Sequence, residues 1–369
     1  MSVITDAEIE RLRGRLGSVV NARDAPYLTE VTRDAIRHWA WGTGDRNPVY
    51  LEKDFARAAG HADVIAPPAM LYAFSRNSVG YRGGLPGVHS VFGGSWWKWH
   101  RRLNLGAEIS ATTTFTDLKD LNGNFAGRML KQVGQTRFND QENRLIAEVE
   151  SWGLRFERAA AGERNRAADR PKAFEHPKLS AERIAEIVEA YRLEAVSVRQ
   201  VPHWDSIEVG AEIPSIIRGP YSSTCAVAFE QAWGGSYIWA HGYWYEFYSR
   251  HPGASMRNEE GVPEAAEAVH WDARAARRAG VAGAYDFGPE RVAWMAILVT
   301  NWGGPRAFLS ELYCEVRRFN ASGNVTRLTG RVGSKERIDE RGYVRLELQA
   351  VDAAGNVTAS GWAILHFTL

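Results

Sequence analysis

One histidine, His270, stands among carboxylates in a stretch where it could take part in acid–base chemistry. It closes the run Glu267-Ala-Val-His270, and Glu264 and Asp286 lie close to it in the sequence. An imidazole titrates near neutral pH, so it can accept a proton in one step and donate a proton in another. The stretch therefore suggests a general acid–base residue, and the alternative is a histidine with a purely structural role.

A second polar cluster lies in the first half of the chain, at residues 44–52, Gly-Asp-Arg-Asn-Pro-Val-Tyr-Leu-Glu. Asp45 and Asn47 offer side chains that could act on a substrate. Short polar side chains also bond to nearby backbone groups, so these two residues could instead cap and brace their own loop. Glu52 and, in the second half, Asp272 are expected to be helix N-caps.

Two buried helices and two sets of strands are expected to position these residues. The run Pro289–Trp302 carries apolar residues on almost every face, which is typical of a helix that is buried all round. Gly288 and Pro289 suit its start, and Pro68 has the same place before residues 69–72 in the first half.

Runs of alternating apolar and polar residues follow each helix, as expected of half-buried antiparallel strands. These runs are Ala107–Asp117, Ala126–Phe138, Arg144–Phe156, Tyr313–Asn320, Asn324–Ile338, Tyr343–Asp352 and Val357–Phe367. A hairpin turn is expected at 352–356. An antiparallel sheet wrapped around one buried helix is the hot-dog architecture, so the sequence predicts an α+β protein of two tandem hot-dog domains.

The two halves repeat one order of elements, which indicates an internal duplication. The same offset of 220 positions relates Tyr50 to His270, Glu52 to Asp272, Ala56 to Ala276 and Gly60 to Gly280. The most polar stretch, 158–198, lies between the repeats; its first part suits a surface connection, and its spacing from Ser180 onward suits a helix. We therefore expect an N-terminal hot-dog domain at 1–158, a linker with a helix at 159–198 and a C-terminal hot-dog domain at 199–369.

The cluster at 44–52 resembles the signature of MaoC-like and (R)-specific enoyl-CoA hydratases. That signature reads Gly-Asp-x-Asn-Pro-apolar-His-x-Asp/Glu with an alanine four residues later, and Ala56 takes the alanine position here. Tyr50 stands where the family has its catalytic histidine. The second half is complementary, because His270 occupies the histidine position whereas Ala265 stands where the family has its aspartate.

The resemblance extends over nearly the whole chain. Asp205–Gly210 looks like the opening of a MaoC-like domain. Gly83–His89 and the tryptophans after it look like the N-terminal half of FAS1-like dehydratase proteins, in which the first signature commonly lacks its histidine. Thr224–Gly235 looks like the element before the second signature, and an insertion that includes the aromatic run Tyr237–Tyr248 separates the two.

This resemblance implies a hydratase or dehydratase that adds or removes water at the C2–C3 bond of an acyl-CoA thioester, which makes it a carbon–oxygen lyase. His270 would be the acid–base residue, and the Gly288 N–H, at the positive end of a helix, would bind the thioester oxygen. Pro68, in the corresponding place, has no N–H to offer. Glu267 and Asp45 are the candidates for the acidic catalytic partner.

Four residues are expected to bind the substrate, namely Asn47, Tyr50, Arg102 and Arg318. Arginine forks match phosphate geometry, so Arg102, Arg318 and the arginines before them could meet the phosphates of CoA. Solvated arginines at the ends of strands are the alternative.

Aromatic and glycine residues near the first signature are expected to shape the acyl site. Trp96, Trp97 and Trp99 would lie in the core and line the groove. Gly83–Gly87, followed by Gly93 and Gly94, would form either a mobile loop over an acyl tunnel or a tight turn.

The composition agrees with a globular protein and excludes several classes of partner. The chain has 369 residues, of which 45% are hydrophobic and 24% charged, and a formal net charge of +1, so neither nucleic acid nor a membrane is expected as a partner. Two cysteines, Cys225 and Cys314, give neither a disulfide framework nor metal-binding spacing, and we expect no metal site and no cofactor. No signal peptide or membrane-spanning run is apparent, so a cytoplasmic location is expected.

Two other functions fit the same residues. Each half lacks a different part of the signature, so the chain could be a non-catalytic or partner-dependent hot-dog subunit that binds acyl-CoA. A hot-dog thioesterase would cleave the thioester instead of hydrating the acyl chain. Either a homo-oligomer or a pairing with another hot-dog chain is expected.

Overall fold

The computed structural model describes residues 4–368 except 21–24, 82, 86–87, 124–125, 158–159, 162, 164–173, 175–177 and 236. Most of the first part of the expected linker, with Pro171 and Pro177, lies outside the described residues, and so do Pro86 and Gly87 of the glycine-rich segment.

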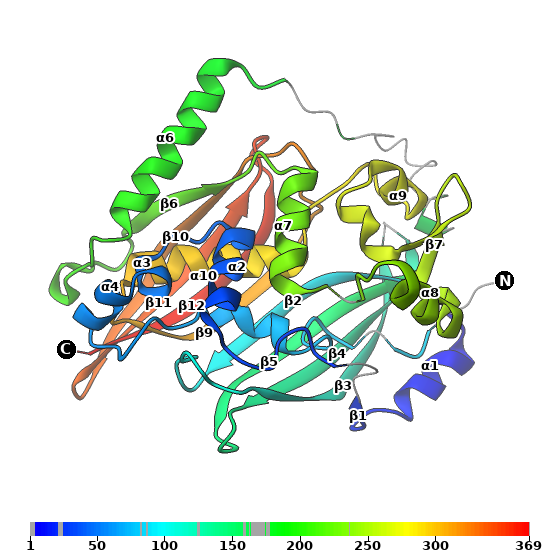
Figure 1. Cartoon of the computed structure of the whole chain (residues 1–369), viewed down its shortest axis with the longest axis horizontal. Coiled ribbons are helices and arrows are strands. Elements are labelled where there is room, and N and C mark those ends of the chain that lie inside the picture. Colours follow the sequence, from blue (N-terminus) through cyan, green and yellow to red (C-terminus); the bar gives the residue numbers. More distant parts are fainter. Residues whose placement is uncertain are drawn as a thin grey trace.

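Ten antiparallel strands form one continuous sheet that runs through both halves of the chain (Figure 1). They are β1 (Val19–Val20), β2 (His89–Trp99), β3 (Ser110–Gly123), β4 (Gly127–Asn139), β5 (Leu145–Phe156), β6 (Glu212–Arg218), β9 (Phe308–Val316), β10 (Thr326–Ile338), β11 (Arg341–Val351) and β12 (Val357–Thr368). Their order is β1-β3-β4-β5-β2-β9-β12-β11-β10-β6, so the second half runs in the reverse order of the first. The halves meet where β2 pairs with β9, and the double hot-dog fold is confirmed.

The long strands form where the sequence alternates, and their turns are set by local polar contacts. Along β11, buried and less buried residues follow one another over its length, as a sheet with one covered face requires. Between β11 and β12, the Asp352 Oδ1 accepts hydrogen bonds from the backbone N–H groups of Ala354 (2.9 Å) and Asn356 (2.8 Å). The hairpin expected at 352–356 is therefore confirmed, with an aspartate that satisfies the turn's donors.

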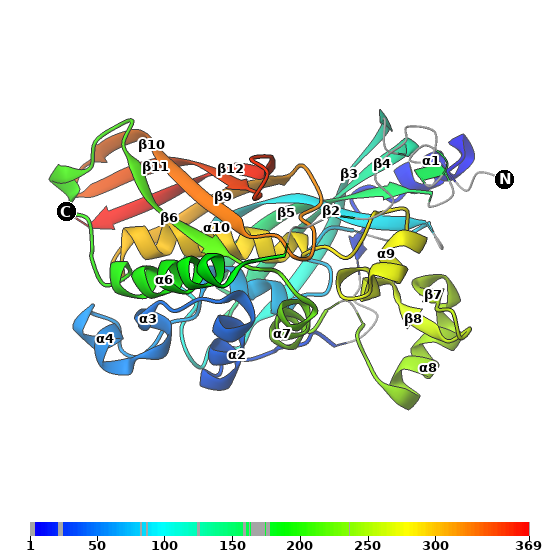
Figure 2. The ribbon, with the colours of Figure 1, turned by 90° about the horizontal axis from the view of Figure 1, so that it is seen from above.

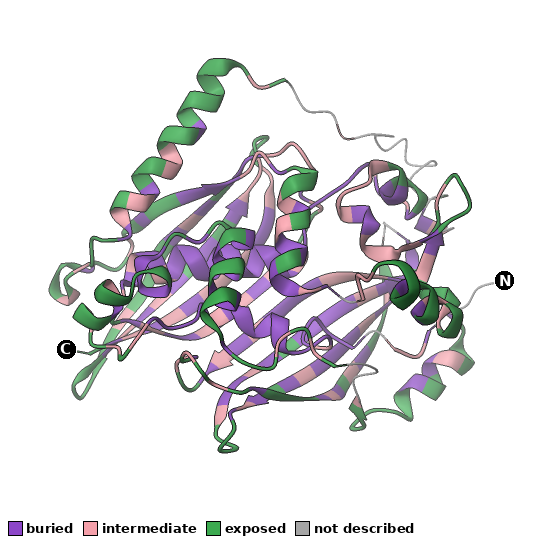
Figure 3. Ribbon diagram, viewed as in Figure 1, coloured by how far each residue is buried: buried purple, intermediate pink, exposed green. Residues whose placement is uncertain are grey.

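One helix in each half packs against the concave face of the sheet, but the two differ in length. The central helix α10 (Gly288–Gly303) begins with Gly288 and Pro289, and most of its residues are buried. Its counterpart is a 3₁₀ helix of seven residues, η1 (Pro68–Phe74), of which six are buried. Most of the described helices lie on one face of the sheet (Figure 2), and buried residues concentrate where these helices meet the sheet (Figure 3).

The internal duplication is visible in the layer of helices outside the two central ones. α2 (Arg33–Thr43) packs beside α7 (Ser223–Trp233), and both end in a left-handed glycine, Gly44 and Gly234. Gly42 lets these helices approach, because a Cβ there would lie 2.7 Å from the backbone oxygen of Ala228.

The 220-residue offset also holds for shorter elements. α3 (Pro48–Leu51) and α4 (Lys53–Ala58) correspond to the 3₁₀ helix η4 (Ala266–His270) and α9 (Ala273–Arg278). Asp272 is the expected N-cap, since its Oδ1 accepts a hydrogen bond from the Arg274 N–H at 2.8 Å. Glu52 holds the corresponding position but makes no capping bond; its carboxylate pairs with Arg199.

Two segments lie outside the repeated units. The linker helix α6 (Ala181–Ser197) begins at the expected cap, Ser180, and packs on β6. The insertion between α7 and η4 contains α8 (His241–Arg250), the 3₁₀ helix η3 (Pro252–Ala254) and a small sheet of β7 (Ser255–Arg257) and β8 (Pro263–Ala265). The remaining elements are α1 (Asp6–Arg13) and the 3₁₀ helix η2 (Trp204–Ser206).

The structure corrects one expectation about the segment after the first central helix. Gly93 and Gly94 belong to strand β2 rather than to a loop, at a register shift opposite Trp152. They are needed there because a Cβ on either residue would lie 2.6 Å or less from the Trp152 ring. Trp97 and Trp99 are core residues as expected, whereas Trp96 lies on the outer face, where its ring contacts Trp362 and Lys98.

In the described part of the chain, no helix is both long enough and apolar enough to cross a bilayer.

Candidate functional site

A cavity of about 1890 Å³ lies between the two halves of the chain. The second half contributes the end of η4, the start of α10 and the segment after β9, while the first half contributes the start of β2 and the end of β5. Side chains of the insertion, among them Trp244 and Phe247, also line the cavity. Its walls therefore come from both halves.

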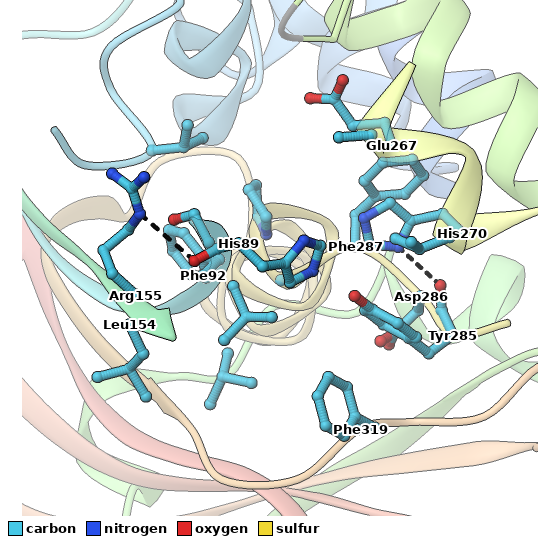
Figure 4. A pocket seen from close by; sticks show the side chains of 18 of the residues that line it. His89, Phe92, Leu154, Arg155, Glu267, His270, Tyr285, Asp286, Phe287 and Phe319 are labelled. Atoms are coloured by element: carbon cyan, nitrogen blue, oxygen red, sulfur yellow. Dashed lines mark hydrogen bonds between the residues drawn. The ribbon is translucent and has the colours of Figure 1, made fainter. Parts of the chain in front are cut away.

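His270 lines this cavity and is held in a fixed orientation. Its Nδ1 lies 2.8 Å from the backbone oxygen of Tyr285, and its ring packs on Phe287 with 3.8 Å between ring centroids. A carbonyl oxygen can only accept a hydrogen bond, so the neutral ring carries its hydrogen on Nδ1 and its lone pair on Nε2. Figure 4 shows the ring beside Phe287 with this bond drawn. The geometry suits a ring that accepts a proton at Nε2.

The start of α10 lies next to His270. Phe287 is the N-cap residue, and Phe287, Gly288 and Pro289 all line the cavity. A Cβ on Gly288 would lie 2.4 Å from a ring carbon of Phe92, so glycine is required for Phe92 of β2 to pack there. The N–H groups that open a helix have no partner within it and carry a partial positive charge, which favours an anionic oxygen.

Two carboxylates near the helix start are engaged with neighbouring side chains. Asp286 is fully buried, pairs with Arg291 at 2.8 Å and accepts a hydrogen bond from Asn320 Nδ2 at 2.8 Å. Burial raises the pKa of Asp286 to about 6, against the opposing effect of Arg291. Glu290 accepts a hydrogen bond from the Tyr221 hydroxyl at 2.8 Å, and burial raises its pKa well above the usual range. These contacts brace the first turn of α10.

Glu267 lines the same cavity as His270. In Figure 4 its carboxylate points away from the His270 ring. Glu264 accepts a hydrogen bond from Asn258 Nδ2 at 3.3 Å. Ala265, at the position of the family aspartate, also lines the cavity but has no group that titrates.

The residues of the first signature occupy a different place. Asp45 and Asn47 are buried and bond within their own loop: Asp45 Oδ1 accepts from the Asn47 N–H at 3.0 Å, and Asn47 Oδ1 accepts from the Val49 N–H at 3.1 Å. Asn47 also donates to Asn301 Oδ1 of α10 at 3.2 Å. Asn47 and Tyr50 line a small pocket of about 30 Å³, the counterpart of the large cavity. A pocket of this size has room for about one water molecule.

Asp45 lies close to a buried ion pair. Arg218 of β6 binds Glu194 of α6 through two hydrogen bonds of 2.9 Å, and both side chains are about 95% buried. Arg218 also donates to the Gly44 oxygen at 3.3 Å. Burial raises the pKa of Asp45 to about 7, although its bond from Asn47 and the charge of Arg218 act in the opposite direction. This cluster ties the first signature to the linker helix.

The two arginines expected at the substrate are separated by the fold. Arg318 lines the large cavity, whereas Arg102 lines the small pocket and donates to the backbone oxygens of Arg306 (2.7 Å) and Ala307 (2.9 Å). Nine arginines and three carboxylates line the large cavity within the described residues. Four of these arginines are in ion pairs (Arg11–Glu8, Arg183–Glu186, Arg291–Asp286 and Arg317–Glu315). The positive charge of the others suits a ligand with phosphate groups.

Three cavity residues were not identified as functional from the sequence: His89, Phe92 and Arg155. His89 is the last residue of the glycine-rich motif of the first half, but nothing in that motif indicates a catalytic role for the histidine. The three residues belong to β2 and β5, more than a hundred positions before His270, and only the pairing of β2 with β9 brings these strands to the second half.

A family model and two relatives match parts of the chain. A family model described as "FAS1-like, dehydratase domain region" matches residues 19–149. A UPF0336 protein of Streptomyces avermitilis is 36% identical over 104 residues, which are 27% of this chain and 68% of that protein. The alpha subunit of a 3-oxo-4,17-pregnadiene-20-carboxyl-CoA hydratase from Mycobacterium tuberculosis is 42% identical over 50 residues, which are 14% of this chain and 16% of that protein.

Solved structures match nearly the whole chain in fold. A MaoC-like dehydratase superposes with a TM-score of 0.65 at 17% identity, over 97% of this chain and 99% of that chain. A Mycobacterium tuberculosis protein described as having a double hotdog fold superposes with a TM-score of 0.56 at 12% identity, over 96% of both chains.

Proposed function

Since this chain belongs to the MaoC-like hot-dog family of hydratases and dehydratases, and matches the FAS1-like dehydratase region and a UPF0336 protein, we propose that it adds water to the C2–C3 double bond of an acyl-CoA thioester or removes it. The observation that carries this proposal is that His270 and the start of α10 line one large cavity. The corresponding place in the first half, at Tyr50, holds only a small pocket.

His270 supplies the base for hydration in this proposal. Its Nδ1–H is directed to the Tyr285 carbonyl, so Nε2 takes a proton from water. The water oxygen forms a bond to C3, the electron pair of the C2–C3 double bond moves toward the thioester carbonyl, and C2 then gains a proton. Dehydration is the same sequence in reverse.

The Gly288 N–H stabilises the negative charge that develops on the thioester oxygen. It lies at the N-terminus of a 16-residue helix, where the backbone dipoles add. A preorganised donor of this kind contributes about 3–4 kcal/mol to the stability of the transition state in comparable sites. Burial of Asp286 against Arg291 and Asn320 holds this end of the helix in place.

The cavity lining suits CoA together with a bulky acyl group. Its arginines, Arg318 among them, offer partners for the phosphates of CoA. Trp244 and Phe247 of the insertion give it aromatic walls, and at about 1890 Å³ it exceeds the range of roughly 300–1,000 Å³ that is common for small-molecule sites. One relative, which matches 14% of this chain, is named as a hydratase of a pregnadiene-carboxyl-CoA, so a polycyclic enoyl-CoA belongs among the substrates to test.

The proposal is tested by hydration of a series of enoyl-CoA thioesters that includes but-2-enoyl-CoA, dec-2-enoyl-CoA and a polycyclic enoyl-CoA. We expect loss of the enoyl absorbance in the wild type and a reduction of kcat of about 10²–10⁴-fold in His270→Ala. His61→Gln is the control, because His61 also bonds a carbonyl, that of Pro305 at 2.9 Å, but does not line the cavity.

Two results would contradict the proposal. A His270→Ala variant with the wild-type rate would show that this histidine is not the base. Release of free CoA, detected with a thiol reagent, without loss of the double bond would identify a thioesterase.

A further inference from the structure

A second histidine lies in the cavity, on the wall that the first half contributes. His89 is the first residue of β2, is only 5% exposed and lines the same cavity as His270. Figure 4 shows its imidazole projecting from the side of Arg155 toward Phe287 and His270. The two rings therefore enter the cavity from opposite walls.

His89 is held in place by its neighbours. Its ring meets Phe156 edge to face, with 5.2 Å between centroids. Buried Arg155 donates to the backbone oxygens of Leu85 (2.8 Å) and Val88 (2.9 Å) and, more weakly, of His89 itself (3.4 Å). These bonds hold the backbone that enters β2 and carries the His89 side chain.

A series of contacts connects the two histidines. His270 packs on Phe287, and Phe287 precedes Gly288 in the chain. The space where Gly288 lacks a Cβ is filled by Phe92, which lies three positions after His89 on the same strand. The start of α10, with the N–H that would bind the thioester oxygen, therefore lies between the strand that carries His89 and the ring of His270.

We infer that His89 is a second catalytic residue, which exchanges the proton at C2 while His270 exchanges a proton with the water. The inference rests on the proposed function. Hydration needs a base for water and an acid for C2, and in this chain Ala265 stands where the family signature has an aspartate. An imidazole from the opposite wall supplies the second proton-transfer group that this half of the signature lacks.

Every proton in this reaction has a donor and an acceptor. The water oxygen forms a bond to C3 and gives one proton to Nε2 of His270, while the C2–C3 electron pair becomes an enolate that the Gly288 N–H stabilises. The enolate then takes a proton at C2 from the protonated His89 ring, which becomes neutral. Exchange with solvent removes the proton from His270 and returns one to His89, so no other reactant is consumed.

The kinetic test uses His89→Gln in the full-length protein, with the enoyl-CoA that the wild type hydrates fastest. We expect kcat to fall about 10²–10⁴-fold, because one general acid is lost, while the dissociation constant of the corresponding saturated acyl-CoA and the melting temperature stay close to those of the wild type. His366→Gln is the matched control. His366 is a half-buried histidine of β12 that packs on Tyr343 of β11 and does not line the cavity. This variant should keep its activity within about twofold.

A binding test does not depend on turnover. Protein with ¹⁵N-labelled histidine contains ten labelled rings, and the His89→Gln, His270→Gln and His366→Gln variants assign the signals of three of them. Addition of a saturated acyl-CoA such as butanoyl-CoA or decanoyl-CoA should shift the His89 and His270 ring signals together, while those of His366 stay unchanged.

The outcomes separate the inference from the proposed function. If the wild type hydrates enoyl-CoA, His270→Ala is inactive and His89→Gln has a kcat within threefold of the wild type, only the inference fails. If the wild type hydrates no enoyl-CoA, the proposed function fails, and the inference that rests on it fails as well. An unchanged His89 signal on binding, or a loss of kcat that is matched by weaker binding of the saturated acyl-CoA, overturns the catalytic role.

Discussion

At the scale of residues, each copy of the signature has kept a different part: the first copy has the aspartate and the second has the histidine. In the second half, His270 faces a large cavity, whereas in the first half Asp45 is buried beside Arg218 and Glu194. A buried carboxyl group in this setting is held by bonds to its own loop and not by a ligand. We therefore propose that Asp45 now has a structural role in the loop of the first signature and takes no part in proton transfer.

The pH dependence of stability tests this role of Asp45. Burial raises its pKa from 3.8 to about 7, so between about pH 4 and pH 7 the folded state keeps a proton that the unfolded state has lost. Stability therefore falls as the pH rises through this window and is lowest above it. Asp45→Asn removes the titration, so we expect the variant to gain stability relative to the wild type at pH 8 compared with pH 5, by an amount on the order of 2–4 kcal/mol.

Urea unfolding of both proteins at the two pH values measures this difference, with the exposed Asp54→Asn as control. The same change in stability at pH 5 and pH 8 would contradict the prediction. The enoyl-CoA hydration rate of Asp45→Asn should stay within a few-fold of the wild type. A loss comparable to that of His270→Ala would show that Asp45 takes part in the reaction.

At the scale of elements, the linker helix is held to the fold by charge as well as by packing. α6 exposes several apolar side chains, including Val188 and Leu193, and buries Ile187 and Glu194. Glu194 binds Arg218 of β6 and also accepts a hydrogen bond from Asn301 Nδ2 of α10 at 3.2 Å. One carboxylate therefore connects the linker, the edge strand and the central helix.

Glu194→Ala should destabilise the protein strongly. It leaves the buried Arg218 without its carboxylate, and loss of one partner of a buried ion pair costs about 3–5 kcal/mol. Glu189→Ala on the same helix is the control, because Glu189 and its partner Arg192 are exposed, and little change is expected. Thermal denaturation measures both variants, and equal melting temperatures would show that α6 is held by its apolar contacts alone.

At the scale of the whole molecule, the two hot-dog units share one sheet and one main core. β2 pairs with β9 over five residue pairs, and the largest cluster of buried side chains includes Trp97 from the first half and Leu312 from the second. Neither half can lose its fold without exposing an edge strand and apolar surface of the other. The oligomeric state and the cytoplasmic location stay predictions from the sequence, and light scattering of the purified protein measures the first.

The shared sheet predicts a single unfolding transition in calorimetry. Leu312→Ala, at the junction, should lower its midpoint by removing a fully buried side chain, a loss of about 2–5 kcal/mol. Leu346→Ala, on β11 and equally buried, is the matched variant away from the junction, and it too should shift one transition for the whole chain. Two separable transitions in either protein would mean that the halves unfold independently.

Much of the fold could be predicted because it follows from local patterns. Alternation of apolar residues specified the long strands, and the all-apolar run after Pro289 specified α10. The spacing of Gly93 and Gly94 predicts a loop or a tight turn, because their role in a strand depends on Trp152, which is distant in sequence. The short central helix of the first half was not foreseen, since Pro68 marks where a helix begins but not where it ends.

The sequence by itself determined the double hot-dog architecture and the duplication. It also determined that His270 holds the histidine position of the second signature, before the helix that begins at Gly288. Only the tertiary structure decided which other residues share the cavity of His270 and Gly288: it placed His89 there, and it placed Asp45, Asn47 and Arg102 elsewhere. The physical reason is that secondary structure depends on neighbours along the chain, whereas this cavity has walls from both halves, which the pairing of β2 with β9 holds together. A contact between residues so far apart leaves no periodic pattern in the sequence.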